Sequence, residues 1–119
     1  MPQNNLTYRR GEIRWVKLDP TVGAEAQKTR PCLIVQNDIM NQYGLLTIVI
    51  PFRPGSKEAP YVVNVKPTPE NGLDSERFID VGQIRAVDHR RILGKLGVLE
   101  EEYWESIRSA LNIVTGFGL

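Results

Sequence analysis

The residues of this chain best suited to hold an anion lie in and just after a polar loop near its N-terminus. Arg30 keeps its positive charge at any working pH, and Pro31 stiffens the backbone after it. The next residues, 32–35, form a short apolar run that is typical of a core strand. The loop at 19–27 is rich in turn-forming and small residues, and we expect it to be exposed and mobile. The pattern predicts a loop that presents a cation at the rim of a strand; a plain surface arginine at a strand start is the alternative.

A second irregular loop carries further cations. Between Pro51 and Pro60 the chain holds three prolines and a glycine, so this stretch cannot form regular structure. If both loops face the same rim, three or four cations converge beside hydroxyl and amide groups. Such a cluster suits a phosphodiester, whereas unrelated solvated charges on separate loops are the alternative. The candidate residues of the two loops are Glu25, Gln27, Lys28, Thr29, Arg30, Arg53, Ser56 and Lys57.

Other chemically notable side chains have structural interpretations. His89 next to Arg90-Arg91 could serve as a general base, but a lone histidine in a charged turn is more often a surface residue. Trp15 and Trp104 could stack on bases, but in so small a domain we expect both in the core. The single cysteine, Cys32, is predicted to be an inert buried thiol. One cysteine and one histidine offer no set of ligands for a soft metal.

Length and composition predict one domain over residues 1–119, with a disordered leader at 1–8. The hydrophobic content of 41% and charged content of 24% are ordinary for a globular protein. No apolar run reaches membrane length, and we expect a cytoplasmic protein with no membrane partner. The net charge of +1 is unevenly spread. Residues 1–99 hold 14 Lys and Arg against 10 Asp and Glu, which permits an anionic partner there, whereas residues 100–119 hold one arginine against four glutamates.

Apolar patterns predict about five strands and one C-terminal helix. The expected strands cover residues 9–18, 32–36, 45–50, 61–65 and 77–87. Asn37 offers a cap for a short helical turn, while the pattern at 92–97 is ambiguous. Three glutamates at 100–102 and an apolar stripe that runs to Val114 predict a helix that ends at Gly116. The predicted fold class is mainly β (α+β): a small β-barrel-like domain with a C-terminal α-helix.

Six short motifs give the chain a resemblance to a known family. They are Arg10-Gly11-Glu12-Ile13, Leu18-Asp19-Pro20, Val22-Gly23-Ala24-Glu25, Thr29-Arg30-Pro31, Val35-Gln36-Asn37-Asp38 and Gly82-Gln83-Ile84-Arg85-Ala86-Val87-Asp88. In their order and spacing, from about residue 9 to the end, the chain resembles the MazF/PemK/Kid family of toxin-antitoxin toxins. The resemblance implies a homodimeric SH3-like barrel of the CcdB/PemK type. It also implies metal-free, cofactor-free cutting of single-stranded RNA, and a cognate antitoxin whose acidic, flexible segment occupies the RNA groove.

The resemblance also implies roles for individual residues. Arg30 matches the family's catalytic arginine, which would clamp the phosphate and stabilise the leaving group. Glu25 matches an acidic position, and would orient Arg30 or take the 2′-hydroxyl proton. Gln83 and Arg85 match the later motif and would hold base or backbone. The RNA-binding residues implied in this way, together with the loop residues above, are Gln27, Lys28, Thr29, Ser56, Lys57, Gln83 and Arg85.

Two positions depart from the family pattern. Many members have a threonine where Arg53 stands, and often an acidic residue where Gly82 stands. Arginine can hold a phosphate but supplies no hydroxyl, so Thr29 or Ser56 is the candidate source of one. RNA binding survives these departures better than efficient cleavage does.

The main prediction is a type II toxin that acts as a sequence-specific, ribosome-independent and metal-independent endoribonuclease, with Arg30, Glu25 and Arg53 as catalytic residues. RNA carries its own nucleophile, the 2′-hydroxyl, so the protein need only align it and stabilise the developing charge. One alternative is a weakened or non-enzymatic member of the same fold that binds RNA, an antitoxin or DNA gyrase. A gyrase binder would depend on the C-terminal helix, whereas a nuclease would depend on the two loops. A plain interaction barrel is the third possibility.

Overall fold

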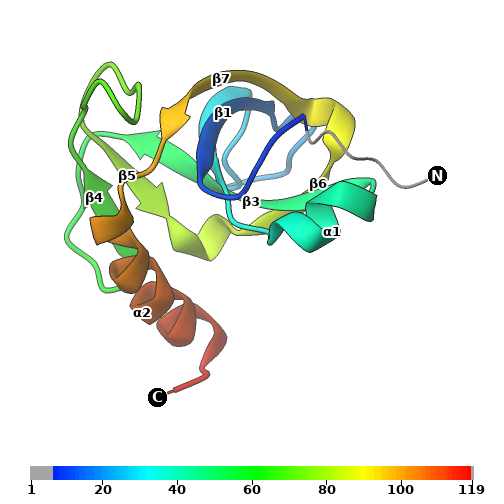
Figure 1. Cartoon of the computed structure of the whole chain (residues 1–119). Coiled ribbons are helices and arrows are strands. Elements are labelled where there is room, and N and C mark those ends of the chain that lie inside the picture. The colour runs from blue at the N-terminus through cyan, green and yellow to red at the C-terminus, as the bar shows by residue number, and fades with distance from the viewer. Residues whose placement is uncertain (1–6, 119) are drawn as a thin grey trace.

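The computed structural model describes residues 7–118, and most of its regular structure is β-strand, with one longer helix at the C-terminal end (Figure 1). The elements in chain order are β1 (Glu12–Lys17), β2 (Thr29–Ile34), α1 (Asp38–Tyr43), β3 (Leu46–Pro54), β4 (Val62–Val65), β5 (Arg77–Asp80), η1 (Val81–Gln83), β6 (Arg85–Asp88), η2 (His89–Arg91), β7 (Ile92–Val98), η3 (Glu101–Tyr103) and α2 (Trp104–Thr115), where η marks a 3-10 turn. Within residues 7–118, no helix has the length and apolar character needed to cross a membrane.

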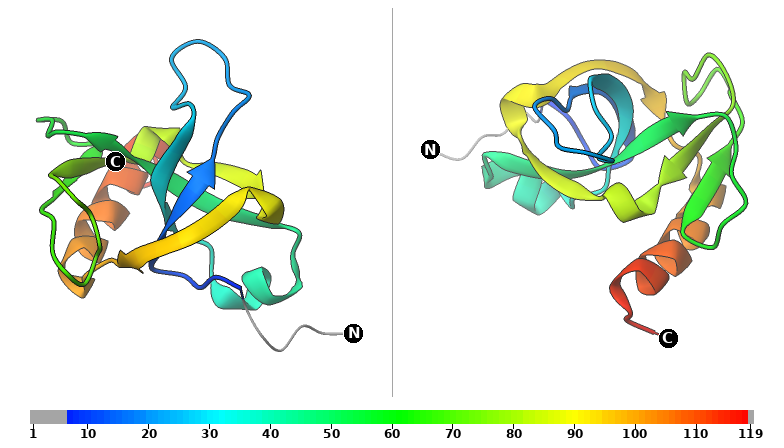
Figure 2. Two further views of the ribbon diagram at one scale, coloured as in Figure 1. Left: turned by 90° about the horizontal axis from the view of Figure 1, so that it is seen from above. Right: turned by 180° about the vertical axis from the view of Figure 1, so that it is seen from behind.

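The seven strands form one antiparallel sheet with the order β4-β5-β3-β2-β1-β7, and β6 also pairs with β3. The long strand β3 organises the sheet, because its start pairs with β6, its centre with β2 and its end with β5. Figure 2 shows how strongly the sheet curls when it is viewed from above and from behind. The predicted mainly β fold with a C-terminal helix is confirmed, and the barrel-like sheet is not closed.

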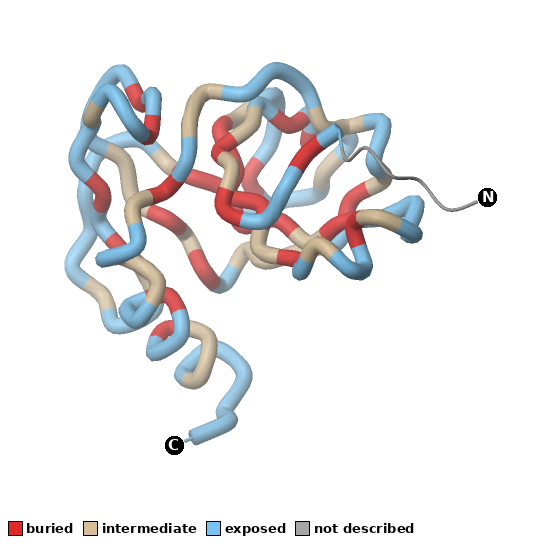
Figure 3. The backbone as a smooth tube through the Cα atoms, viewed as in Figure 1, coloured by how far each residue is buried: buried red, intermediate tan, exposed pale blue. Residues whose placement is uncertain are grey.

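Both faces of β2 are buried, because its side chains alternate between two apolar clusters. Leu33 belongs to the first cluster, which Ile107 of α2 helps to form. Cys32 belongs to the second cluster, which is completed by Ala26 from the loop at 18–28. Burial on both faces explains why β2 reads as a continuous apolar run. Figure 3 shows the buried positions gathered along the middle of the sheet, with exposed backbone in the outer loops.

The single strand predicted at 77–87 is wrong, because the structure has two strands there. The 3-10 turn η1, which contains Gly82, separates β5 from β6. β5 pairs with β3 from Phe52 onward, and β6 pairs with β3 up to Val49. The turn therefore carries the chain from one part of the β3 edge to another, a change that depends on the tertiary pairing.

The predicted end of the third strand at Pro51 is also wrong, since β3 continues to Pro54. Pro51 pairs with Cys32 of β2, in the interval between the β6 and β5 pairings. In this interval β3 has no strand partner on its other edge, so a residue without an N–H group is tolerated there. The ambiguous segment at 92–97 forms β7, which pairs with β1.

The ends of the described chain differ in part from expectation. Of the predicted leader, residues 1–6 lie outside the described residues, whereas Tyr8 is buried in the second cluster. The helix α2 begins at Trp104 without a side-chain cap, after the 3-10 turn that holds two of the three glutamates. It ends at Gly116 as predicted, where a positive φ of 82° gives the left-handed C-cap.

Asn37 caps α1 as predicted, since its side chain accepts a hydrogen bond from the Met40 backbone.

Candidate functional site

The loop between β1 and β2 is anchored to the second apolar cluster close to the point where it enters β2. Ala26 is 3% exposed and packs into that cluster, although its neighbours in the loop are exposed. Its backbone N–H donates a hydrogen bond of 3.2 Å to Oε1 of Gln83. Gln83 belongs to η1, so the turn that separates β5 from β6 also holds the loop. The loop was predicted to be exposed and mobile, and its exposure is confirmed apart from this buried residue.

Two arginines hold the root of the same loop. Arg91 donates from Nη1 to the carbonyl oxygen of Lys17, over 2.9 Å, and to that of Asp19. Arg85 donates from Nη1 to the carbonyl oxygen of Leu18 over a longer 3.4 Å. The two neighbouring arginines therefore have different roles: Arg91 supports the loop, whereas Arg90 forms an ion pair with Asp88. Hydrogen bonds from Arg90 hold the pKa of the Asp88 carboxyl well below its usual range.

Arg30 lies at the point where the loop enters β2. It is half-buried, and its Nε donates to the carbonyl oxygen of Gln27 over 2.9 Å. Within residues 7–118 no hydrogen bond or ion pair engages its two terminal nitrogens. Since Arg30, Cys32 and Ile34 alternate onto one face of β2, the Arg30 side chain stands at the open end of the second cluster. A guanidinium held only through Nε leaves its planar fork available for two oxygens of one phosphate.

The pKa of the Cys32 thiol depends on its burial and on two arginines near it. Burial raises the pKa of Cys32 to about 12, and the positive charges of Arg85 and Arg30 act in the opposite direction. Both guanidinium groups therefore lie close enough to influence the thiol. The predicted burial of Cys32 is confirmed, and the raised pKa disfavours the reactive thiolate.

Arg53 lies on the same side of the sheet as Arg30. Cys32 of β2 pairs with Pro51 of β3. Arg30 lies two residues before Cys32, and Arg53 lies two residues after Pro51. Because side chains alternate along a strand, both arginines project from the face that carries the second cluster. Nη1 of Arg53 lies 3.5 Å from Oδ2 of Asp80, a partner that sequence analysis missed. Nothing in the sequence pattern singled out Asp80, because the β3–β5 pairing brings it there.

The other predicted residues of the first loop make no hydrogen bond or ion pair to the Arg30 guanidinium through their side chains in the described part of the chain. Glu25 is exposed, and its Oε1 accepts a hydrogen bond of 2.6 Å from the backbone N–H of Val22, so the carboxylate stabilises its own loop. No hydrogen bond or ion pair in the described part of the chain joins Glu25 to Arg30. Gln27, Lys28 and Thr29 are exposed beside Arg30, and Lys28 turns the chain into β2 with a positive φ of 68°.

The loop after β3 is organised by β4. The backbone of Lys57 exchanges two hydrogen bonds of 3.0 Å with the side chain of Asn64, and its ammonium lies 5.4 Å from the Tyr61 ring centroid. Ser56 next to it is exposed. No contact among residues 7–118 ties Ser56 or Lys57 to Arg30, so the structure joins Arg53, but not the tip of this loop, to the first group.

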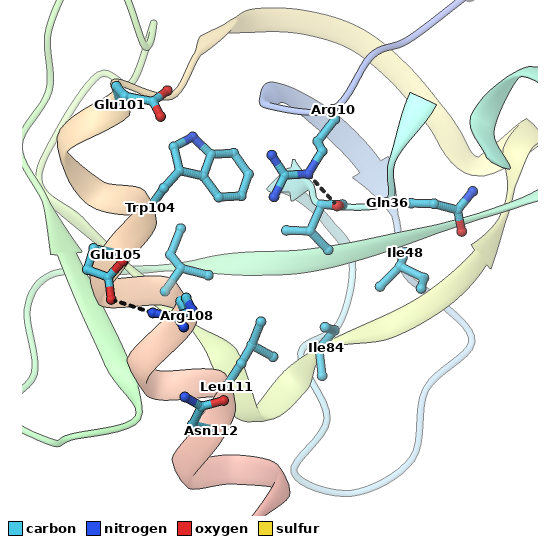
Figure 4. A pocket seen from close by; sticks show the side chains of 12 residues that line it. Arg10, Gln36, Ile48, Ile84, Glu101, Trp104, Glu105, Arg108, Leu111 and Asn112 are labelled. Atoms are coloured by element: carbon cyan, nitrogen blue, oxygen red, sulfur yellow. Dashed lines mark hydrogen bonds and ion pairs between the residues drawn. The ribbon is translucent and has the colours of Figure 1, made fainter. Parts of the chain in front are cut away.

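A separate groove of about 640 Å³ runs between α2 and β3, on the face that carries the first cluster (Figure 4). Its lining is mixed: Ile48 of β3, Ile84 just before β6 and Leu111 of α2 are apolar, whereas charged side chains such as Glu105 and Arg108 of α2 also line it. At one end the Arg10 guanidinium lies 4.1 Å from the Trp104 ring centroid. None of the predicted site residues lines this groove. Across residues 7–118 no three His, Cys, Asp or Glu side chains gather as metal ligands would.

The tryptophans differ from prediction. Trp104 is half-buried at this groove, but Trp15 is 39% exposed, so its placement in the core was wrong. Val16 takes the inward position of β1, and the side chain before it must face outward. The expected surface position of His89 is confirmed.

Comparison with known proteins gives concordant matches. The family model described as "PemK-like, MazF-like toxin of type II toxin-antitoxin system" matches residues 9–115. The chain is 30% identical over 109 residues to the endoribonuclease EndoA of Bacillus subtilis (strain 168), covering 91% of this chain and 94% of that protein. It is 33% identical over 109 residues to the endoribonuclease MazF of Staphylococcus epidermidis, covering 91% of each chain.

Solved structures match the fold at lower sequence identity. A crystal structure of MazF from Deinococcus radiodurans superposes with a TM-score of 0.81 at 20% identity, covering 95% of this chain and 99% of the other. An endoribonuclease in complex with its cognate antitoxin, from a mycobacterial species, gives a TM-score of 0.77 at 18% identity with the same coverage of 95% and 99%. At these identities the two structures support the architecture alone.

Proposed function

This chain belongs to the family of PemK-like, MazF-like toxins of type II toxin-antitoxin systems, and we propose that it is an endoribonuclease that cuts single-stranded RNA. The observation that carries the proposal is the state of Arg30, whose guanidinium is fixed through Nε and presents both terminal nitrogens at the rim of the sheet. A second cation, Arg53, projects from the same face. The matched relatives that share about a third of the sequence are named endoribonucleases.

The proposed reaction uses the nucleophile of the substrate. The 2′-oxygen of RNA attacks the adjacent phosphorus, the bond from phosphorus to the 5′-oxygen breaks, and the products end in a 2′,3′-cyclic phosphate and a 5′-hydroxyl. The 2′-hydroxyl gives up its proton to a base, and the leaving 5′-oxygen takes one from solvent water. Arg30 and Arg53 stabilise the charge on the phosphate oxygens, and Glu25 takes the 2′-hydroxyl proton after its loop hydrogen bond opens. Such a reaction proceeds without a metal because the attacking group is already present.

The remaining residues of the site would bind the strand around the cut. Gln27, Lys28 and Thr29 are exposed next to Arg30 and suit the flanking phosphates. Arg85 adds charge beside Cys32. Ser56 and Lys57 would contact RNA farther along, where their loop extends beyond β3. We further propose that the cognate antitoxin places an acidic, flexible segment on the same cations, since carboxylates and phosphates attract the same guanidinium forks.

The groove at α2 supports the proposed homodimer. Its apolar wall continues into exposed apolar side chains, with Leu46 52% and Val114 38% exposed. A second copy of the chain would cover this surface, which is otherwise a costly exposure of apolar area. The groove lies on the face that carries the first cluster, whereas Arg30 lies on the face of the second cluster, so a dimer formed there leaves the RNA site open.

The test of the proposed function compares the wild-type chain with Arg30→Ala. Each protein is incubated with a long single-stranded RNA in the presence of a chelator, and the ends of the products are mapped. We expect discrete cuts that bear 2′,3′-cyclic phosphates, lost by at least about a hundredfold in the variant. Cuts that persist in Arg30→Ala would remove Arg30 from the reaction. Binding of RNA by the wild-type chain without any cutting would instead establish the non-enzymatic alternative.

A further inference from the structure

We infer that Gln83 is a positioning residue for Arg30, a role that rests on the proposed function and acts through the loop between the two residues. Two hydrogen bonds form the connection. Oε1 of Gln83 accepts from the N–H of Ala26 over 3.2 Å, and the carbonyl of the next residue, Gln27, accepts from Nε of Arg30 over 2.9 Å. The backbone of two consecutive loop residues, Ala26 and Gln27, is thus hydrogen-bonded to Gln83 through the first residue and to Arg30 through the second.

The burial of Ala26 makes this connection rigid. Ala26 is 3% exposed and packs into the second cluster, so the loop is seated by an apolar side chain as well as by the Gln83 amide. Losing the Gln83 acceptor would leave a partly buried N–H without a partner, which is costly. The loop backbone would then shift, and the carbonyl of Gln27 would move with it.

The consequence for Arg30 follows from the geometry of a guanidinium. With Nε fixed, the plane of the fork is set, and its two terminal nitrogens have one direction in which to meet phosphate oxygens. A shift of the Gln27 carbonyl would tilt that plane. Because positioning errors of about an ångström can cost a hundredfold in rate, an indirect effect of Gln83 on cleavage is physically reasonable.

This role differs from direct contact with RNA, which the family resemblance implied for Gln83. Its amide oxygen accepts from the loop, so only the amide nitrogen is left to contact a base. The two roles make different predictions when Arg30 is absent. A residue that acts through Arg30 loses its effect, whereas a residue that contacts RNA keeps it.

The first experiment is a double-mutant cycle with Gln83→Met, Arg30→Ala and the double variant. Single-turnover cleavage is measured on the mapped RNA, and binding is measured on the same sequence with a 2′-O-methyl group at the cut, which blocks attack. We expect Gln83→Met to slow cleavage about tenfold in the wild-type background and to change neither cleavage nor binding in the Arg30→Ala background by more than about twofold. Equal losses in both backgrounds would overturn the inference.

The second experiment follows the loop without RNA, using the only cysteine of the chain as a reporter. Cys32 lies in the same cluster as Ala26, and its thiol is protected by burial and by its raised pKa. We expect a thiol reagent to label Cys32 several-fold faster in Gln83→Met, because an unseated Ala26 opens the cluster. In Gln83→Glu, which keeps an acceptor oxygen, labelling should stay at the wild-type rate. Unchanged labelling in Gln83→Met would contradict the anchoring role.

A matched control is Gln42→Met, the same chemical change on α1, where no hydrogen bond of the side chain is found among residues 7–118. It should leave both cleavage and Cys32 labelling unchanged. Because labelling needs no RNA, it can fail or succeed independently of the proposed nuclease. A chain that does not cut RNA would refute the proposed function, whereas normal labelling in Gln83→Met would refute the positioning role alone.

Discussion

Arg53 stands where many relatives are expected to carry a threonine, and the structure gives it a carboxylate partner. The contact between Nη1 of Arg53 and Oδ2 of Asp80 is 3.5 Å, longer than a good charge-assisted hydrogen bond. Side-chain exposures of 31% and 18% leave the pair partly open to solvent. An arginine held this loosely can bind a phosphate instead of Asp80, but binding the phosphate requires the contact with Asp80 to break.

We therefore predict that Asp80→Asn strengthens RNA binding. Partly exposed ion pairs contribute about 0.2–1 kcal/mol, so the dissociation constant of a 2′-O-methylated RNA should fall by about 1.4- to fivefold at low salt. Fluorescence anisotropy measures the change. Asp74→Asn is the control, since it removes the same charge from a carboxylate that pairs with Arg77 and is 82% exposed. An equal gain in both variants would show that net charge alone is responsible.

At the scale of elements, the connection between β4 and β5 is packed closely against β7. A Cβ atom on Gly97 would lie 2.3 Å from the carbonyl oxygen of Glu70 and 2.5 Å from the carbonyl carbon of Asn71. That carbonyl of Glu70 also accepts the N–H of Val98 over 2.9 Å. The backbone of the connection therefore cannot move away without breaking its contact with β7.

The prediction that follows compares two glycines of the same strand. Gly97→Ala should lower the free energy of unfolding by about 1–3 kcal/mol, because the added methyl group must displace backbone. Gly94→Ala should change it by less than about 0.5 kcal/mol, since nothing lies within 4 Å of the added atom. Urea unfolding of each variant measures the difference. Similar stabilities for the two variants would contradict the close packing.

The same elements show how far sequence alone could lead. The apolar runs identified β2 and the stripe of α2, because burial of a whole face leaves a periodic trace in the sequence. The division of 77–87 into β5 and β6 left no such trace, because it depends on which part of β3 each half pairs with. For the same reason Asp80 was missed, and so was the support that Arg91 gives to the loop. Arg30 could be singled out because its loop, strand start and motif are all local.

At the scale of the whole molecule, the two proposed surfaces are chemically distinct. The rim that carries Arg30 and Arg53 is cationic and suits RNA, while the groove at α2 has an apolar floor with charges of both signs around it. Charge steers an anionic strand to the first surface, and apolar area favours a second copy of the chain on the second. The groove is wide enough that a single copy leaves Ile48 and Ile84 only partly covered.

We predict that Ile48→Glu converts a dimer into a monomer. Ile48 lines the groove and is only partly buried, so a glutamate can be solvated in the single chain but would be buried without a partner in the dimer. Sedimentation velocity should show the wild-type chain at twice the mass of the variant, and circular dichroism should show that both are folded. Leu93→Glu is the control, because Leu93 is 43% exposed on β7 and does not line the groove. If Ile48→Glu keeps the wild-type mass, the copies do not meet at this groove; if it is monomeric and still cuts RNA, each chain holds a complete site around Arg30.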